Sequence, residues 1–328
     1  MLATLIIALT VATTSPDDAL AVSLYGSVVS SASNGVIAPA SIKGALAVVA
    51  LGASGSTAKD LAKLTGSSSA SGTTRILTNV SLSPAFVSEA TAKFHATFAP
   101  QPAGAADAIT IENAVHFKGA WKIAFDKGAT RDEPFVTAST GASKGTGAQA
   151  PLPVPMMHLS SRSLRAAHGR DFDVVELGYQ DGSTFTLVVP SKSDGLALVE
   201  KSLARALATK LRAQPVELSL PRFHASASQD IGAALKHAGL THAFCGDAGV
   251  DFSKLAKEPV CINAVDHDAS VDVDEAGTVA EAVTRIHMAK EGEPEGPGPL
   301  EIRADHPFLF AIRDASGALA FIGHVVAP

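Results

Sequence analysis

The spacing of hydrophobic and polar residues divides the first part of the chain into helices and short connections. Apolar residues recur every four positions over 17–31, after two aspartates that can cap a helix, and Asn34-Gly35 marks a stop. Residues 36–66 predict a short strand, a Pro-led turn and two helices. The Ser-, Gly- and Thr-rich residues 67–78 indicate a loop.

The rest of the chain alternates between strand and helix patterns without a fixed repeat. Residues 109–125 are rich in β-branched and aromatic side chains and predict one long strand with a bend at Gly119. Residues 172–190 predict a hairpin around a Gln-Asp-Gly-Ser turn, and residues 194–213 a helix. Further segments indicate strands at 216–228 and 269–275, a helix at 229–240 and two buried strands around 314–317. This mixture is typical of an α+β domain built on large sheets.

Composition limits the classes of partner. The 328 residues are 46% hydrophobic and 18% charged, an ordinary globular profile. The 26 basic residues against 32 acidic ones give a net charge of −6, and no Lys/Arg cluster occurs. The electrostatic footprint of a nucleic-acid-binding protein is therefore missing, and we expect no nucleic-acid partner.

The N-terminus carries an apolar run, residues 2–12, which is too short to span a bilayer. Its length suits the core of a signal peptide, although no Lys or Arg occurs before Lys43. We expect residues 1–16 to be a signal peptide or an N-terminal extension, and residues 17–328 to form one domain. An extracellular or periplasmic location follows from the first option and a cytoplasmic one from the second.

Residues of known chemistry form no familiar constellation. Cys245 and Cys261 do not have zinc-ligand spacing and are expected to be free, partly buried thiols. A calcium loop begun at Asp272 would place Val283 where a bidentate Glu is required, so the acidic run is better explained as a strand with outward carboxylates. No His-Glu-x-x-His or Gly-x-Ser-x-Gly motif occurs. We expect no metal, no cofactor and no enzymatic activity, with a histidine-dependent hydrolase as a distant alternative.

Several segments in one order resemble the serpin family. "VIAPASI", "ENAVHFKGAW", "TRDEPF", "VPMM", "VELSLPRF", "KEPVCINAVDHDASVDVDE", "EAGT", "ADHPFLFAIRD" and "FIGHVVAP" match its landmarks, and the resemblance covers 17–66, 109–135 and 152–328. It implies three β-sheets with surrounding helices and an exposed reactive loop at about 275–300. Thr57 and Asn113 are about half as far apart as the family usually has them. This resembles a shortened member of prokaryotic type, which lacks part of the helix and strand region before Asn113.

The resemblance implies a suicide inhibitor of proteases. In such proteins the protease cleaves the exposed loop, and the loop then enters the central sheet as a new strand while the acyl-enzyme is trapped. The implied partner is a serine protease, trypsin-like or subtilisin-like, with cysteine proteases as a second class, and the inhibitor is expected to be a monomer. The alternative is a non-inhibitory binding or scaffold protein of the same fold, whose loop is cut without trapping.

The loop itself has the pattern that insertion requires. A strand that enters a sheet must bury every second side chain and lack proline, and Gly and Pro are absent from 278–291. The buried set would be Thr278, Ala280, Ala282, Thr284, Ile286 and Met288. The hinge residues implied by the resemblance are Glu275, Gly277, Thr278, Ala280 and Ala282.

The remaining site residues also come from the resemblance. The scissile bond is placed at Lys290-Glu291, with Glu291-Gly292 as second choice. Arg222 is expected to pair with the hinge acid Glu275 near Trp121, at the top of the central sheet. A buried polar cluster of Ser41, Asn113 and His267 is expected beneath the point where that sheet opens, where its hydrogen bonds would set the barrier to opening.

Overall fold

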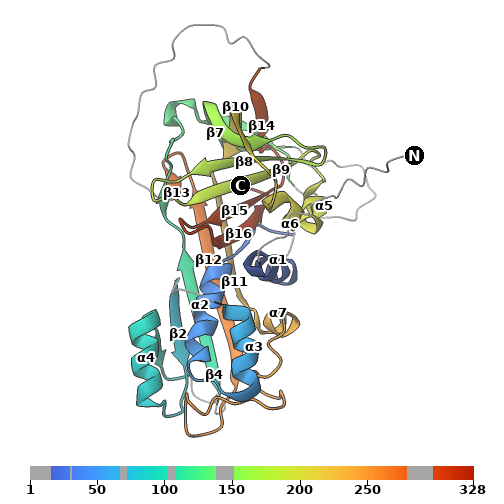
Figure 1. The fold of residues 1–328 in the computed structure, drawn as a ribbon. Helices are drawn as coiled ribbons and strands as arrows, with labels where there is room; N and C mark the ends of the chain where they lie inside the picture. The colour runs from blue at the N-terminus through green and yellow to red at the C-terminus, as the bar shows by residue number, and fades with distance from the viewer. Residues whose placement is uncertain (1–15, 30–31, 67–71, 102–107, 138–150, 279–297) are drawn as a thin grey trace, which may run out of the picture.

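The computed structural model describes residues 16–29, 32–66, 72–101, 108–137, 151–278 and 298–328. Two large sheets lie one above the other; α2, α3, α4 and α7 lie around the lower one, whereas α5 and α6 lie beside the upper one (Figure 1). The helices are α1 Pro16–Val28, α2 Pro39–Ala50, α3 Gly55–Thr65, α4 Pro84–Phe94, α5 Leu196–Lys201, α6 Leu203–Leu207 and α7 Gly232–His237. The expected class, α+β with three sheets and surrounding helices, is confirmed.

The upper sheet has nine strands and the lower, central sheet has five. The upper sheet contains β1 Gly35–Ile37, β6 Arg131–Phe135, β7 Leu152–Ala167, β8 Phe172–Gly178, β9 Thr184–Pro190, β10 Arg212–Pro221, β14 Leu300–Arg303, β15 Phe308–Arg313 and β16 Leu319–Val325. The central sheet has the order β11-β12-β4-β2-β3, from Phe223–Asp230, Ile262–Val273, Ile109–His116, Thr73–Leu77 and Thr97–Ala99. A third, two-stranded sheet pairs β5 Gly119–Ala120 with β13 Gly277–Thr278.

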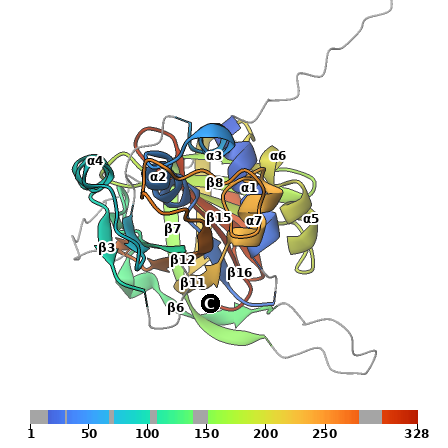
Figure 2. The same ribbon diagram turned by 90° about the horizontal axis from the view of Figure 1, so that it is seen from below.

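The helices α1, α2, α3 and α7 lie on one side of the central sheet (Figure 2). They pack against its inward side chains to form one hydrophobic cluster, which includes Leu46, Ile76 and Ile111. A second cluster fills the space around the upper sheet, with Phe185, Leu218 and Val271 among its members. In β12 the alternation predicted from the sequence is clear, because Val265, His267, Ala269, Val271 and Val273 are buried and the residues between them are not.

Several expected elements differ from the structure. The predicted strand 109–125 ends as β4 at His116, and only Gly119 and Ala120 continue in extended form as β5. The predicted helix 194–213 is divided into the short helices α5 and α6. The predicted loop 67–78 contains β2, which pairs with β4 and buries Thr74 and Ile76. The alternation of buried and exposed residues in β2 was not recognised in the sequence, because a run of small polar residues precedes the strand.

The expectation of two free thiols is wrong. Cys245 and Cys261 form a disulfide, with their Cα atoms 4.9 Å apart. The pairing depends on a tertiary contact, because Phe244 forms a bridge with Ile262 and Cys245 N–H donates to the carbonyl of Ile262. The disulfide therefore ties the loop after α7 to the residue just before β12.

Candidate functional site

After β12 the chain makes a tight turn, Asp274–Thr278, which we call the hinge segment. Asp274 N–H donates to the carbonyl of Gly277 at 2.8 Å, and the Asp274 carboxylate accepts from the N–H groups of Ala276 and Gly277. Gly277 has φ 150°, and a Cβ there would clash with the carbonyl oxygen of Gly119. Only glycine allows β13 to approach β5 this closely.

Glu275 holds the hinge segment to the body of the protein. Its side chain is 2% exposed, and one carboxylate oxygen accepts from Arg222 Nε at 2.8 Å, Arg222 Nη2 at 2.5 Å and Thr130 Oγ1 at 2.6 Å. Burial alone would favour the neutral acid, but hydrogen bonds from Arg222 and Thr130 outweigh it and lower the pKa of Glu275. The structure thus contains the ion pair between Arg222 and Glu275 that was expected at the top of the sheet.

Aromatic side chains contact both ends of the hinge segment, at Asp274 and at Thr278. Trp121 donates its indole N–H to the carbonyl of Asp274 at 2.9 Å and stacks on Tyr179, with ring centroids 4.4 Å apart. The hydroxyls of Tyr179 and Thr278 lie 2.8 Å apart, and Thr278 is fully buried. The first residue of the proposed inserting strand therefore already points into the protein, while it pairs with β5 rather than with the central sheet.

Below the hinge segment, β4 and β12 are direct neighbours in the central sheet. They run parallel, and their register pairs Asn113 with His267 and His116 with Ser270. A strand that follows β12 through the hinge turn would run antiparallel to both of them. We call the boundary between β4 and β12 the seam, because it is where a strand would have to enter.

A buried polar chain crosses the inner side of the seam. His267 is fully buried; its Nε2 accepts the N–H of Ala38 at 3.1 Å, so Nδ1 carries the proton and donates to Asn113 Oδ1 at 2.9 Å. The Asn113 amide donates in turn to the carbonyl of Thr73 at 3.4 Å. Burial lowers the pKa of His267 to about 4, which keeps the ring neutral. Ser41, the third member expected here, is fully buried on α2.

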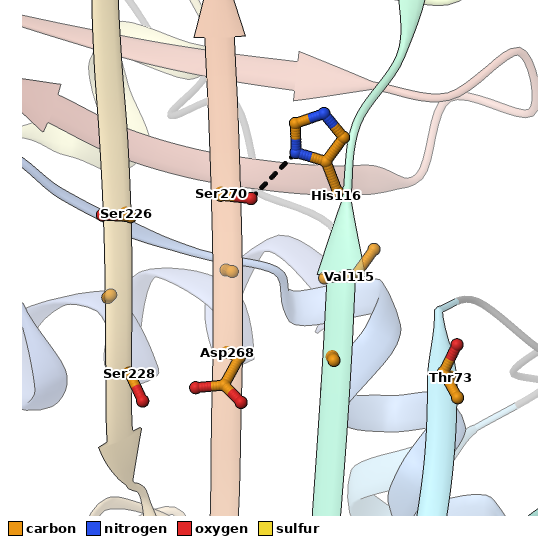
Figure 3. Close-up of a pocket in the computed structure, with 10 residues that line it drawn as sticks. Thr73, Val115, His116, Ser226, Ser228, Asp268 and Ser270 are labelled. Carbon is orange, nitrogen blue, oxygen red and sulfur yellow. Dashed lines mark hydrogen bonds between the residues drawn. The ribbon is translucent and has the colours of Figure 1, made fainter.

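The outer side of the seam is open. A depression of about 570 Å³ lies across β11, β12, β4 and β2, and its floor includes Ala114, Ala269 and Ser226. Figure 3 shows this face, with His116 directed toward Ser270, to which its Nδ1 is hydrogen-bonded at 2.8 Å. Among the described residues no helix crosses this face (Figure 3).

Some of the expected residues lie outside the described part of the chain. These are the hinge positions Ala280 and Ala282 and the three residues of the scissile-bond assignments, Lys290, Glu291 and Gly292. Thr130 and Tyr179 contact the hinge segment but were not identified from the sequence. Thr130 begins a segment that matched the family. Tyr179 comes just before the predicted hairpin turn, and the hairpin pattern did not indicate a contact with the hinge segment.

The comparisons identify the family. A family model described as "Serpin (serine protease inhibitor)" matches residues 85–328, and the chain belongs to the serpin family. Serpin-Z1C of Triticum aestivum is 34% identical over 69% of this chain and 58% of its own length. Serine proteinase inhibitor 2 of Rabbitpox virus is 29% identical over 66% of this chain and 61% of its own length. The match therefore spans about three fifths of these relatives, and the family expected from the motifs is confirmed.

Solved structures confirm the fold. Serpin48 of the insect Tenebrio molitor superposes with a TM-score of 0.78, at 20% identity over 95% of this chain and 97% of that one. Human thyroxine-binding globulin, solved in a complex, gives a TM-score of 0.77 at 20% identity over 96% and 98%. Serpins are generally inhibitors rather than enzymes. No helix in the described residues is long and apolar enough to cross a membrane.

Proposed function

We propose that this protein inhibits a serine protease as a suicide substrate, by insertion of its cleaved reactive loop into the seam. The observation that carries the proposal is the direct pairing of β4 with β12, next to a hinge turn that already reverses the chain. A strand that continues from this turn would be antiparallel to both neighbours. Its alternating side chains would meet the buried side of β12 at every second residue.

The free energy available to such an insertion is substantial. About ten new backbone hydrogen bonds, at about 1 kcal/mol net each, would supply on the order of 10 kcal/mol before apolar burial is counted. The cost includes the seam hydrogen bonds and the chain through His267 and Asn113. The hinge segment adds a local restraint, because Thr278 must exchange its pairing with β5 for a place between β4 and β12.

The protease is proposed to cleave Lys290-Glu291, with Glu291-Gly292 as second choice. A basic residue before the bond suits the pocket of a trypsin-like enzyme. Subtilisin-like enzymes are the other serine-type candidates, and cysteine proteases are the second class. We also propose an extracellular or periplasmic location. The disulfide between Cys245 and Cys261 supports it, since such bonds persist mainly in oxidising compartments.

The proposal is tested by mixing the protein with trypsin-, chymotrypsin- and subtilisin-like proteases and separating the products on a denaturing gel. We expect a covalent complex with at least one of them. Mass spectrometry of the released C-terminal peptide would then locate the bond. Cleavage by every enzyme without any complex would contradict inhibition and favour a binding or scaffold role.

A pair of variants in the loop separates insertion from simple cleavage. Ala282→Arg places a charge on the side that must be buried, which is costly, so it should convert the protein from inhibitor to substrate. Val283→Arg, one residue further, places the same charge on the outer side and should keep most complex formation. Equal behaviour of the two variants would be inconsistent with an inserted strand.

A further inference from the structure

One level of the central sheet carries a row of charged side chains on its open face. Asp230 of β11 pairs in register with Asp266 of β12, Asp266 with Glu112 of β4, and Glu112 with Arg75 of β2. The residues on either side of this level point inward, as buried Val265, His267 and Ile111 show. Three carboxylates thus stand side by side on adjacent strands, an arrangement that destabilises a sheet.

The Asp230 carboxylate accepts hydrogen bonds from the N–H groups of Gly232 and Val265, whereas Asp266 and Glu112 have little compensation. Arg75 reaches Glu112 at 3.5 Å, and both side chains are largely exposed. Within the described part of the chain no Lys, Arg or His forms an ion pair with Asp266. Burial and the neighbouring carboxylates of Asp230, Glu112 and Asp268 raise the pKa of Asp266. The closed seam therefore holds two carboxylates, Asp266 and Glu112, opposite each other without a cation between them.

The hinge turn determines which residue of the loop would reach this level. Asp274 N–H donates to the carbonyl of Gly277, so these two residues are already paired as the end of an antiparallel hairpin. Continuing the pairing one residue at a time places Thr278 opposite Val273 and Arg285 opposite Asp266. Side chains alternate in direction along a strand, and Val273 points inward. Thr278 would then point inward as well, and Arg285 outward onto the open face.

We propose that the inserted strand seats the guanidinium of Arg285 between Asp266 and Glu112, so that Arg285 positions the strand in its final register. This rests on the loop insertion proposed above. In that state the row across the sheet would be Asp230, Asp266, Arg285, Glu112 and Arg75. Both new neighbours of Arg285 would then carry the opposite charge. The repulsion in the closed seam is exchanged for two cross-strand ion pairs.

Two cross-strand ion pairs on an exposed face have a moderate effect. The reversal of the charge on Arg285 removes both pairs and is expected to change the outcome of insertion about tenfold, which corresponds to about 1.4 kcal/mol. The effect should weaken as salt is added, because the charges lie at the surface. A residue with a merely structural role in the loop would show neither the salt dependence nor the dependence on the partner acids.

The test measures the ratio of covalent complex to cleaved, released protein for a protease that the wild type inhibits. Arg285→Glu is expected to lower this ratio about tenfold at low salt and less at high salt. Lys210→Glu makes the same change in net charge at an exposed position between α6 and β10, and should leave the ratio unchanged. The combination of Arg285→Glu with Asp266→Arg should recover most of the loss. Since Asp266→Arg could impair folding, Asp266→Asn provides a second background, in which Arg285→Glu should cost about half as much on a logarithmic scale, because only the pair with Glu112 remains to be lost.

The outcomes separate this inference from the proposed function. If the wild type forms the complex and gains thermal stability on cleavage, but Arg285→Glu behaves the same at every salt concentration, the seating of Arg285 is wrong and insertion stands. A loss from Arg285→Glu that is equally large in the Asp266→Asn background would also overturn it. If the cleaved wild type gains no thermal stability, loop insertion itself is wrong, and the seating of Arg285 is overturned with it.

Discussion

Removal of the Arg222 side chain should loosen the hinge segment by a measurable amount. In Arg222→Met the Glu275 carboxylate, 2% exposed, keeps only the Thr130 hydroxyl among its present side-chain donors. Hydrogen bonds to a charged group contribute about 1.5–3 kcal/mol, and an unpaired buried charge costs about 3–5 kcal/mol. Because the Arg222 side chain is 45% exposed, water can take part of its place. We expect a loss of about 2 kcal/mol.

The single tryptophan provides the assay. Trp121 donates its indole N–H to the carbonyl of Asp274, so its fluorescence reports directly on the hinge segment during denaturant unfolding. Arg165→Met is the matched control, since Arg165 forms a 2.7 Å ion pair with Glu176 at the surface of the upper sheet. That variant should lose less than about 1 kcal/mol.

The loss of stability in Arg222→Met should also depend on pH. The folded-state pKa of Glu275 is below its ordinary value of 4.5, so its contribution is present above that pH and is lost as the pH falls through the lower value. The difference between wild type and Arg222→Met should therefore narrow below about pH 4.5. Equal losses in Arg222→Met and Arg165→Met, with a difference that does not change with pH, would refute the reasoning.

Three further predictions concern the seam and the base of the central sheet. Asn113→Ala leaves the buried Nδ1–H of His267 without its acceptor and should cost about 1–3 kcal/mol, seen as a lower midpoint of thermal unfolding; an unchanged midpoint would count against the polar chain. Asp60 lies on α3, and hydrogen bonds, chiefly from His242, lower its pKa to about 2. Asp60→Asn should therefore lower the free energy of unfolding at neutral pH, and this difference from wild type should vanish as the pH falls from about 4 to about 2. A difference that does not change with pH would contradict this. Reduction of the disulfide between Cys245 and Cys261, which are 16 positions apart, should remove about 3 kcal/mol, and coincident melting curves with and without reductant would argue against it.

The sequence predicts those parts of the site that depend on local pattern. The alternation along β12 fixed which of its side chains are buried, and the family motifs located Arg222, Glu275 and Trp121, which the structure brings together. Features made by distant contacts were missed. The disulfide depends on how the loop after α7 meets β12, and Tyr179 reaches Thr278 only because a hairpin of the upper sheet folds over the hinge segment. No local pattern carries such information.

The hinge turn also limits how this sequence can change in evolution. In the proposed inserted state, its hydrogen bond between Asp274 and Gly277 would set the pairing of every later residue of the inserted strand with β12. A mutation that adds or removes one residue between Val273 and the inserting strand would exchange the two faces of that strand. Its charged side chains would then point into the core. Residues beyond Met288 lie outside the proposed inserting strand, so their number can change without exchanging its two faces. Lineages could therefore vary the length and the cleavage specificity of the distal loop while the few codons of the turn stay fixed in number.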